Sequence, residues 1–213
     1  MIKGYIIDMD GTLLDSMEIW ENAAITFLKN KGIIVDNELK NILAPLSIKE
    51  AINYIKKRYY LSESLTEIQN LVLDLIEYQY LNEANLKSGV REFIKKCVLL
   101  NKKLCLLTAN QRDLTIKILT KHKLIDYFNQ IITCDDTSLT KQNPDIYKYA
   151  AKQLNLKINE CIVIEDALHA INTAKKAGFT VWGVADQSNL KDWIKIKSIS
   201  DLTFKNIKYM EVL

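Results

Sequence analysis

Two carboxylates stand one residue apart near the amino terminus, in the segment Asp8-Met9-Asp10-Gly11-Thr12. The apolar residues 5–7 precede them directly, which predicts a buried strand that opens into a polar turn. In open α/β sheets, ligands bind in the crevice beyond the carboxyl ends of the strands. Since side chains alternate along a strand, Asp8 and Asp10 can both face that crevice while Met9 points away. The alternative is an ordinary turn, because Asp and Gly end many strands, so residues elsewhere in the chain must decide.

Other polar side chains follow the later apolar runs of the sequence in the same way. They are Thr108, Lys141 and the pair Glu165-Asp166. If the runs are parallel strands, these residues meet Asp8 and Asp10 at one edge of the sheet. Carboxylates that face a lysine and a hydroxyl suit an Mg²⁺-assisted phosphoryl transfer, since Mg²⁺ prefers hard oxygen ligands and takes few carboxylates beside waters and substrate phosphate. An acidic pair at the end of an all-apolar strand has little structural reason to exist.

Five apolar runs alternate with amphipathic helical patterns, which predicts that a parallel sheet positions these polar residues. The runs cover residues 5–7, 104–107, 130–134, 161–164 and 180–184. Four of them are almost continuously apolar, as strands are in a sheet covered by helices on both faces. Asn143 and Pro144 have the residue types of an N-cap and a first helical position, and Gly178 is typical of the residue just after a helix. We therefore expect an α/β fold, a Rossmann-like parallel sheet of five or more strands flanked by helices.

A helical segment interrupts this alternation after the first strand. Residues 16–85 show helical periodicity and no convincing strand, and four helices are expected there. Pro45 would end the second helix, and capping boxes would begin the third at Ser47 and the fourth at Ser64. The expected organisation is a core domain of residues 1–15 and 86–213 with an inserted helical-bundle cap domain of residues 16–85. The paired connections at its two ends can serve as a hinge.

The composition excludes several classes of function. The 213 residues include 29 Lys+Arg against 26 Asp+Glu, and the net charge of +3 is too mild to indicate nucleic-acid binding. No apolar run approaches the roughly 18 residues of a membrane span, and no signal peptide is expected, since the first residues lead straight into a strand. The cysteines lie inside apolar runs, and their spacing fits neither a zinc site nor a disulfide framework. We expect reduced core cysteines in a cytoplasmic protein: Cys97, Cys105, Cys134 and Cys161.

Taken in order, these motifs resemble those of the haloacid dehalogenase superfamily, and in particular of its phosphatases with a helical cap inserted after the first strand, the branch similar to β-phosphoglucomutase. The resemblance covers almost the whole chain. Four motifs support it: Asp8 to Thr12, Thr108, Lys141 with Asn143-Pro144-Asp145, and Glu165-Asp166.

The resemblance implies roles for several residues of these motifs. Asp8 would be the nucleophile that forms an aspartyl phosphate, and Asp10 would be the general acid and base. Mg²⁺ would be held by the carboxylates of Asp8 and Asp166 and by the backbone carbonyl of Asp10, with Glu165 as an outer partner or a further ligand. The phosphoryl oxygens would be bound by Thr108, the amide of Ala109 and Lys141. Asn110 is expected to cap the next helix, and Asp135 or Asp136 could orient Lys141.

The function implied is Mg²⁺-dependent hydrolysis of a small phosphorylated metabolite, a sugar phosphate or a nucleotide-derived ester. The enzyme is expected to be a monomer, with a weak homodimer as the alternative. A phosphosugar mutase is the enzymatic rival, but β-phosphoglucomutases resemble this chain less in the cap, with a His where Trp20 falls and an Arg near Ile48. The other rival is a catalytically silent binding protein, although no catalytic position is missing. Trp20 and Lys49 are the candidate specificity residues, with packing inside the insert as the alternative for Trp20. Gln142, Ala167 and Ala170 depart from the common pattern of the family without removing a catalytic group.

Overall fold

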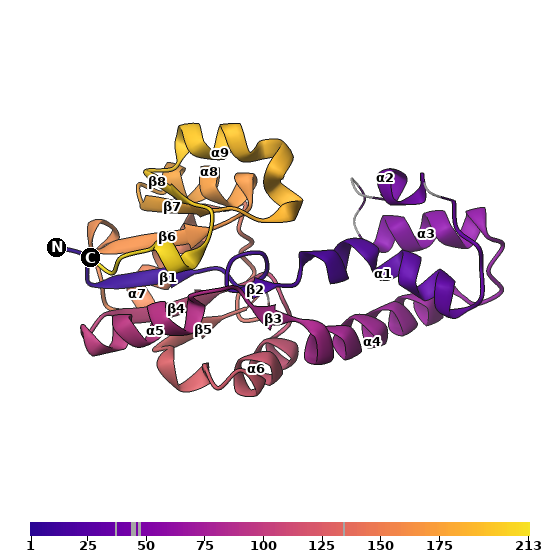
Figure 1. The fold of residues 1–213 in the computed structure, drawn as a ribbon, viewed down its shortest axis with the longest axis horizontal. Coiled ribbons are helices and arrows are strands. Elements are labelled where there is room, and N and C mark those ends of the chain that lie inside the picture. The colour runs from indigo at the N-terminus through magenta and orange to yellow at the C-terminus, as the bar shows by residue number, and fades with distance from the viewer. Residues whose placement is uncertain (37, 44–45, 47, 134) are drawn as a thin grey trace. The chain divides into compact units, whose positions relative to one another are not determined.

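The chain forms two compact units. The computed structural model describes residues 1–36, 38–43, 46, 48–133 and 135–213 (Figure 1). One unit, which we call the sheet unit, comprises Met1–Asp15 and Asn85–Leu213. The other, the helical unit, comprises Ser16–Ala84. Pro45, Ser47 and Cys134, for which the sequence suggested roles, lie outside the described residues.

A six-stranded sheet with every pair parallel organises the sheet unit. Its strands are β1 (Gly4–Ile7), β4 (Lys103–Leu107), β5 (Gln130–Ile132), β6 (Cys161–Glu165), β7 (Thr180–Val184) and β8 (Leu202–Phe204), in the spatial order β5-β4-β1-β6-β7-β8. This arrangement confirms the predicted α/β class. The first strand is central, so its carboxyl end lies between those of β4 and β6.

The sixth strand was not predicted from the sequence. β8 is only three residues long, and none of its residues is fully buried. Such a short segment carries no recognisable apolar run. Its pairing with β7, Trp182 opposite Leu202 and Val184 opposite Phe204, defines it as an edge strand.

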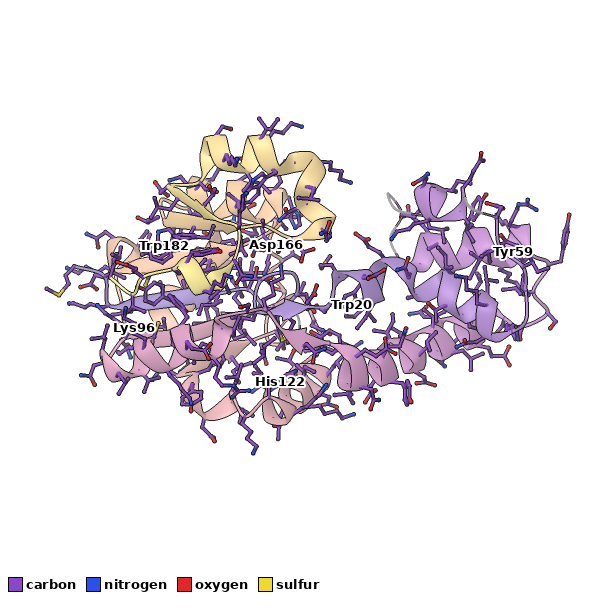
Figure 2. All side chains as sticks on the ribbon, viewed as in Figure 1. Trp20, Tyr59, Lys96, His122, Asp166 and Trp182 are labelled. Atoms are coloured by element: carbon purple, nitrogen blue, oxygen red, sulfur yellow. The ribbon has the colours of Figure 1, made fainter. Side chains whose placement is uncertain are left out.

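Helices follow the strands and cover the sheet. They are α5 (Val90–Leu99), α6 (Arg112–Lys121), α7 (Asp145–Gln153), α8 (Leu168–Lys176) and α9 (Trp193–Ile199), with 3₁₀ turns at η1 (Ile125–Tyr127), η2 (Ile158–Glu160), η3 (Gln187–Asp192) and η4 (Ile207–Tyr209). One buried cluster joins Ile6 and Val163 of the sheet to Tyr147 of α7 and Ile171 of α8. Tyr5 is next to Ile6 in β1, so its side chain points to the opposite face of the sheet. There its ring packs against two other aromatic rings: its centroid lies 5.4 Å from that of Phe93 in α5 and 5.8 Å from that of Trp182, which is labelled in Figure 2. Both sides of each central strand are therefore buried, which explains the continuous apolar runs.

The described residues of the helical unit form four helices, as the periodicity predicted. They are α1 (Met17–Asn30), α2 (Leu39–Leu43), α3 (Ile48–Arg58) and α4 (Leu65–Glu83). Their apolar faces form one buried cluster that includes Leu28, Ile55 and Ile68. The capping box at Ser64 is present: the Ser64 hydroxyl accepts from the Glu67 N–H at 3.2 Å, and the Glu67 carboxylate accepts from the Ser64 N–H at 2.7 Å. Two backbone donors that a helix start leaves unsatisfied are thereby paired.

A short antiparallel pair of strands joins the two ends of the inserted segment. β2 (Leu14–Asp15) pairs with β3 (Asn85–Leu86), and the Lys87 N–H donates to the Leu13 carbonyl at 2.9 Å. The chain thus leaves the sheet unit and returns to it at adjacent points.

None of the helices in the described part of the chain combines the length and apolar character that crossing a membrane requires.

Candidate active site

The carboxyl end of β1 turns sharply and brings its polar residues to the sheet edge. The Met9 carbonyl accepts from the N–H groups of both Leu13 and Leu14 at 2.9 Å. Gly11 makes this turn possible with φ of 78°, a left-handed conformation that side chains disfavour. Asp8 is 6% exposed, and its N–H donates to the Ile164 carbonyl at 3.0 Å, which ties the residue to β6.

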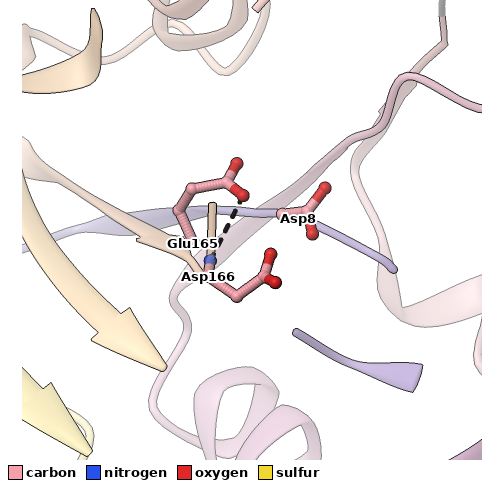
Figure 3. Close-up of side chains that lie close together, drawn as sticks. All are labelled: Asp8, Glu165 and Asp166. Atoms are coloured by element: carbon pink, nitrogen blue, oxygen red, sulfur yellow. Dashed lines mark hydrogen bonds between the residues drawn. The ribbon is translucent and has the colours of Figure 1, made fainter. Parts of the chain in front are cut away.

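Three buried carboxylates meet at this edge. Asp8, Glu165 and Asp166 each offer an oxygen, and these oxygens all lie within 4.8 Å of one another (Figure 3). The side chain of Asp10 is not part of this group and is half-buried. The parallel pairing of β1 with β6, Ile7 opposite Ile164, places Asp8 beside Glu165 although 157 residues separate them in the sequence. The predicted convergence of the strand ends therefore produces a real cluster.

Lys141 is the cation of this cluster. Its Nζ donates to Asp8 Oδ1 and, at 2.8 Å, to Glu165 Oε2, and its side chain is 10% exposed. Burial opposes the charged form of Lys141, but the charges of Asp8 and Glu165 outweigh it and hold the pKa above the usual range. The acids that bond this lysine are Glu165 and Asp8, whereas the bonds of Asp135 and Asp136 go to Arg112 and Thr133.

The carboxylates carry more negative charge than Lys141 offsets. Burial and the charge of Glu165 raise the pKa of Asp8 to about 6, against the lowering effect of Lys141. Burial, followed by the charges of Asp8 and Glu165, also raises the pKa of Asp166 well above its usual value. Buried charges are costly unless they are paired or coordinate a metal. The donor set, hard carboxylate oxygens with unmet negative charge, therefore fits a small divalent cation such as Mg²⁺.

Glu165 and Asp166 are held differently. Glu165 Oε1 accepts from the N–H groups of Asp166 and Ala167 at 3.2 and 3.3 Å, so both of its oxygens have donors once Lys141 is counted. Asp166 Oδ1 accepts from the Thr12 hydroxyl at 3.4 Å. This difference is consistent with Glu165 as a supporting residue and Asp166 as a ligand.

The end of β4 supplies the neutral part of the site. Thr108 is buried, and its hydroxyl oxygen accepts from the Asn110 N–H at 3.1 Å. A hydroxyl that accepts one bond can still donate its own proton. Ala109, between the two, is exposed. A cavity of about 330 Å³ opens beside these residues, and the polar residues that line it are Thr108, Thr133, Thr137, Ser138, Thr140 and Lys141.

Asn110 lies two residues before the first residue of α6, and its Oδ1 accepts from the Gln111 N–H, directly before the helix, at 2.8 Å. Its amide Nδ2 donates to Asp10 Oδ2 at 3.4 Å, so it contacts the second carboxylate of the first motif. The first N–H of α6, that of Arg112, is instead bound by Asp135 at 2.8 Å. Asp135 lies on the loop after β5, and a pairing between two loops leaves no local signal in the sequence.

The fold and the polar residues at its strand ends agree with the match of this chain to a known protein family. The family model for haloacid dehalogenase-like hydrolases matches residues 5–184. The chain belongs to this family. The match spans the sheet unit from β1 to β7 and includes the inserted helices.

Similar proteins of the family include enzymes that act on phosphorylated carbohydrates. The chain is 25% identical to hexitol phosphatase B of Escherichia coli (strain K12), over 97% of this chain and 96% of that protein. It is 27% identical to β-phosphoglucomutase of Bacillus subtilis (strain 168), over 96% and 93% of the two chains. Among solved structures, a putative β-phosphoglucomutase from Thermotoga maritima superposes with a TM-score of 0.84 at 21% identity, over 96% and 94% of the two chains. This structural likeness confirms the fold of the family.

The two specificity candidates lie in the helical unit. The Trp20 ring, labelled in Figure 2, is half-buried and makes an edge-on contact with Tyr80, with centroids 6.0 Å apart. Packing inside the helical unit, the alternative considered for Trp20, is therefore present. Lys49 is exposed on α3. Contact of either residue with a substrate stays a prediction.

Sequence reasoning missed three residues of the site. Thr12 was quoted as part of the first motif without a role, and it bonds Asp166. Asn110 was assigned to a helix cap, and it contacts Asp10. Asn189, whose amide donates to the Asp166 carbonyl at 2.9 Å, was not considered at all. It follows the carboxyl end of β7, so the rule that found the other candidates could also have found it.

Proposed function

We propose that this hydrolase is an Mg²⁺-dependent phosphatase that hydrolyses a small phosphorylated metabolite through an aspartyl phosphate on Asp8. A sugar phosphate is the first substrate class to consider, with a nucleotide-derived ester as the second. The observation that supports this proposal most is the buried contact of Asp8 with Lys141, set within the carboxylate cluster of Glu165 and Asp166. An anionic nucleophile beside a fixed ammonium suits attack on a phosphate group.

The class of reaction agrees with the family and with its named members. The prediction of an enzyme acting on phosphoric monoesters is confirmed at this level, since relatives that match 85% to 97% of this chain are named as phosphatases. Hexitol phosphatase B and 6-phosphogluconate phosphatase of Escherichia coli (strain K12) are named for sugar-derived phosphates. These names favour a phosphorylated carbohydrate for this chain as well.

The first half-reaction would transfer the phosphoryl group to the protein. A carboxylate oxygen of Asp8 forms a bond to phosphorus as the bond to the leaving oxygen breaks, and Asp10 gives its proton to that oxygen. Asn110, through its bond to Asp10, would hold the acid in place. Lys141 and the Thr108 hydroxyl would bind the phosphoryl oxygens and offset their charge.

The second half-reaction would restore the enzyme. Asp10 takes a proton from a water molecule, whose oxygen attacks phosphorus as the bond to Asp8 breaks. The products are inorganic phosphate and the original Asp8 carboxylate. Asp10 is half-buried whereas Asp8 is almost fully enclosed, which suits a residue that must exchange protons with leaving group and water.

Electrostatics explains why a cation is needed beside Lys141. Each pair of unit charges about 4 Å apart costs about 4 kcal/mol at an effective dielectric near 20, so Asp8 and a phosphate dianion repel each other strongly. The carboxylates of Asp8 and Asp166, with the backbone carbonyl of Asp10, would hold Mg²⁺. When bound, the ion would neutralise charge shared between Asp8 and the phosphoryl oxygens.

The two rival functions lead to different products. A phosphosugar mutase remains to be considered because β-phosphoglucomutase of Bacillus subtilis (strain 168) is among the similar proteins. A mutase would return a rearranged sugar phosphate, whereas the proposed phosphatase releases inorganic phosphate. A silent binding protein would yield neither, although Asp8, Asp10 and Lys141 are all present.

Removal of the metal tests the proposal. We expect phosphate release from a panel of phosphorylated metabolites to require Mg²⁺ and to be strongest with a sugar phosphate. In Asp166→Ala, the Mg²⁺ concentration for half-maximal activity should rise by about tenfold or more, because a ligand is lost. Asp126→Ala, which removes an exposed acid in η1, ahead of β5 and outside all four motifs, is the matched control and should leave this concentration unchanged. Activity in a chelator, or an unchanged metal requirement in Asp166→Ala, would contradict the assignment.

The proposal also covers the location and the oligomeric state of the enzyme. We keep a cytoplasmic monomer as the expected form, with a weak homodimer as the alternative. The cysteines that the structure describes, Cys97, Cys105 and Cys161, are buried and form no disulfide. Burial raises the pKa of the Cys97 thiol to about 12, which makes it unreactive.

A further inference from the structure

The amide of Asn189 connects the carboxyl ends of two neighbouring strands at the site. Asn189 lies in η3 and is 6% exposed. Its Nδ2 donates to the carbonyls of Asp166, just after β6, and Val184, at the end of β7, both at 2.9 Å. Its Oδ1 accepts from the Asp186 N–H at 3.1 Å. Both donors and the acceptor of the amide are thus used, so the side chain has a defined orientation against the Asp166 backbone.

A buried ion pair supports Asn189. The Asp186 carboxylate pairs with Lys87 at 2.6 Å and accepts from the Ser188 N–H and hydroxyl at 2.9 and 2.7 Å. Lys87 also donates to the Ala185 carbonyl at 3.1 Å. The side chains of Lys87 and Asp186 are only 11% and 3% exposed. Because a buried charge that loses its partner is strongly disfavoured, this pair holds the backbone from which Asn189 projects.

Lys87 is also connected to the side chain of Asp166, through the segment of Thr12 and Leu13. Lys87 also binds the Leu13 carbonyl through its N–H at 2.9 Å. Leu13 follows Thr12, whose hydroxyl donates to Asp166 Oδ1 at 3.4 Å. Asp166 is therefore held through its side chain by Thr12 and through its backbone by Asn189. Partners that orient a metal ligand commonly change metal affinity about 10- to 100-fold when removed.

We propose that Asn189 is a positioning residue that fixes Asp166 for the metal ion, and that the Lys87–Asp186 pair keeps Asn189 in place. This inference rests on the metal site of the proposed function. Without the amide, the Asp166 carbonyl would lose its donor, and the peptide between β6 and α8 could rotate. The Asp166 carboxylate would then leave the position it shares with Asp8 and Glu165.

Calorimetric titration with Mg²⁺ in the absence of substrate tests this role separately from activity. The variants are Asn189→Ala, Lys87→Met and the control Asn129→Ala. Asn129 also bonds a backbone group, the Leu104 N–H at 2.8 Å, but near the start of β4, away from its carboxyl end. We expect Asn189→Ala to raise the Kd for Mg²⁺ by about tenfold or more and Lys87→Met to raise it less. Asn129→Ala should lower the urea midpoint without changing the Kd.

The outcomes separate the two proposals. A wild-type protein that does not bind Mg²⁺ would overturn the metal site itself. A wild type that binds Mg²⁺, with a folded Asn189→Ala variant of equal affinity, would overturn only the positioning role. If Asn189→Ala does not fold, the milder Asn189→Ser is titrated instead with the same expectation, since its short hydroxyl cannot reach both carbonyls.

Discussion

At the scale of single residues, Asp8 and Asp10 differ in their surroundings although one residue separates them. Asp8 is buried against Lys141, and Asp10 is half-buried beside Asn110. Asp8→Asn should therefore abolish turnover, because the nucleophile is lost while the fold remains. Asp10→Asn should slow turnover about 100- to 10,000-fold, the usual contribution of general acid–base catalysis. With p-nitrophenyl phosphate, whose leaving group needs no proton, Asp10→Asn should accumulate a phosphoenzyme that, as an acyl phosphate, survives an acid quench and is cleaved by hydroxylamine. Rapid-quench measurements would detect it, and appreciable activity in Asp8→Asn would rule out the covalent mechanism.

At the scale of elements, the start of α4 is set by the reciprocal bonds of Ser64 and Glu67. Ser64→Ala should lower the free energy of unfolding of the helical unit by about 1 kcal/mol, the usual cost of losing a capping side chain. Hydrogen bonds from Ser64 lower the pKa of Glu67. The contribution of Glu67 is therefore present above its ordinary pKa and is lost as the pH falls through the lowered value. Urea unfolding followed by circular dichroism at neutral and acidic pH measures both effects. Ser62→Ala, two residues before the N-cap, is the control, and an equal loss in both variants would contradict the capping role.

At the scale of the whole molecule, the helical unit is inserted at the ladder of β2 and β3, which follows the turn at the end of β1. We expect it to act as a cap that excludes water and recognises the leaving group. Lys49→Ala and Trp20→Ala should then change the preference among phosphate esters by about tenfold, while the hydrolysis of acetyl phosphate changes less than about twofold. Comparing kcat/KM for the preferred ester and for acetyl phosphate checks this. Because Trp20 packs on Tyr80, unfolding of its variant must be measured in parallel. An equal loss on both substrates would exclude specificity at that position.

The sequence by itself determined the class of the fold and pointed to most of the residues that meet at the candidate site. Strands buried on both faces must be apolar throughout, so β1, β4, β6 and β7 are visible as runs, and polar residues at their ends stand out. The helical insert is visible for a similar reason, since its helices each bury one face. These patterns are local in the sequence, and a local pattern can be recognised without knowing which residues it will contact in the fold.

Only the tertiary structure decided which of these residues touch. Lys141 bonds both Asp8 and Glu165, Asn110 contacts Asp10, and Asn189 binds the Asp166 carbonyl. Each contact joins residues that end or follow different strands, so its existence depends on how the strands are ordered in the sheet rather than on nearby residues in the sequence. β8 escaped prediction for the same reason, because a three-residue edge strand is defined by its pairing with β7 and not by its own composition.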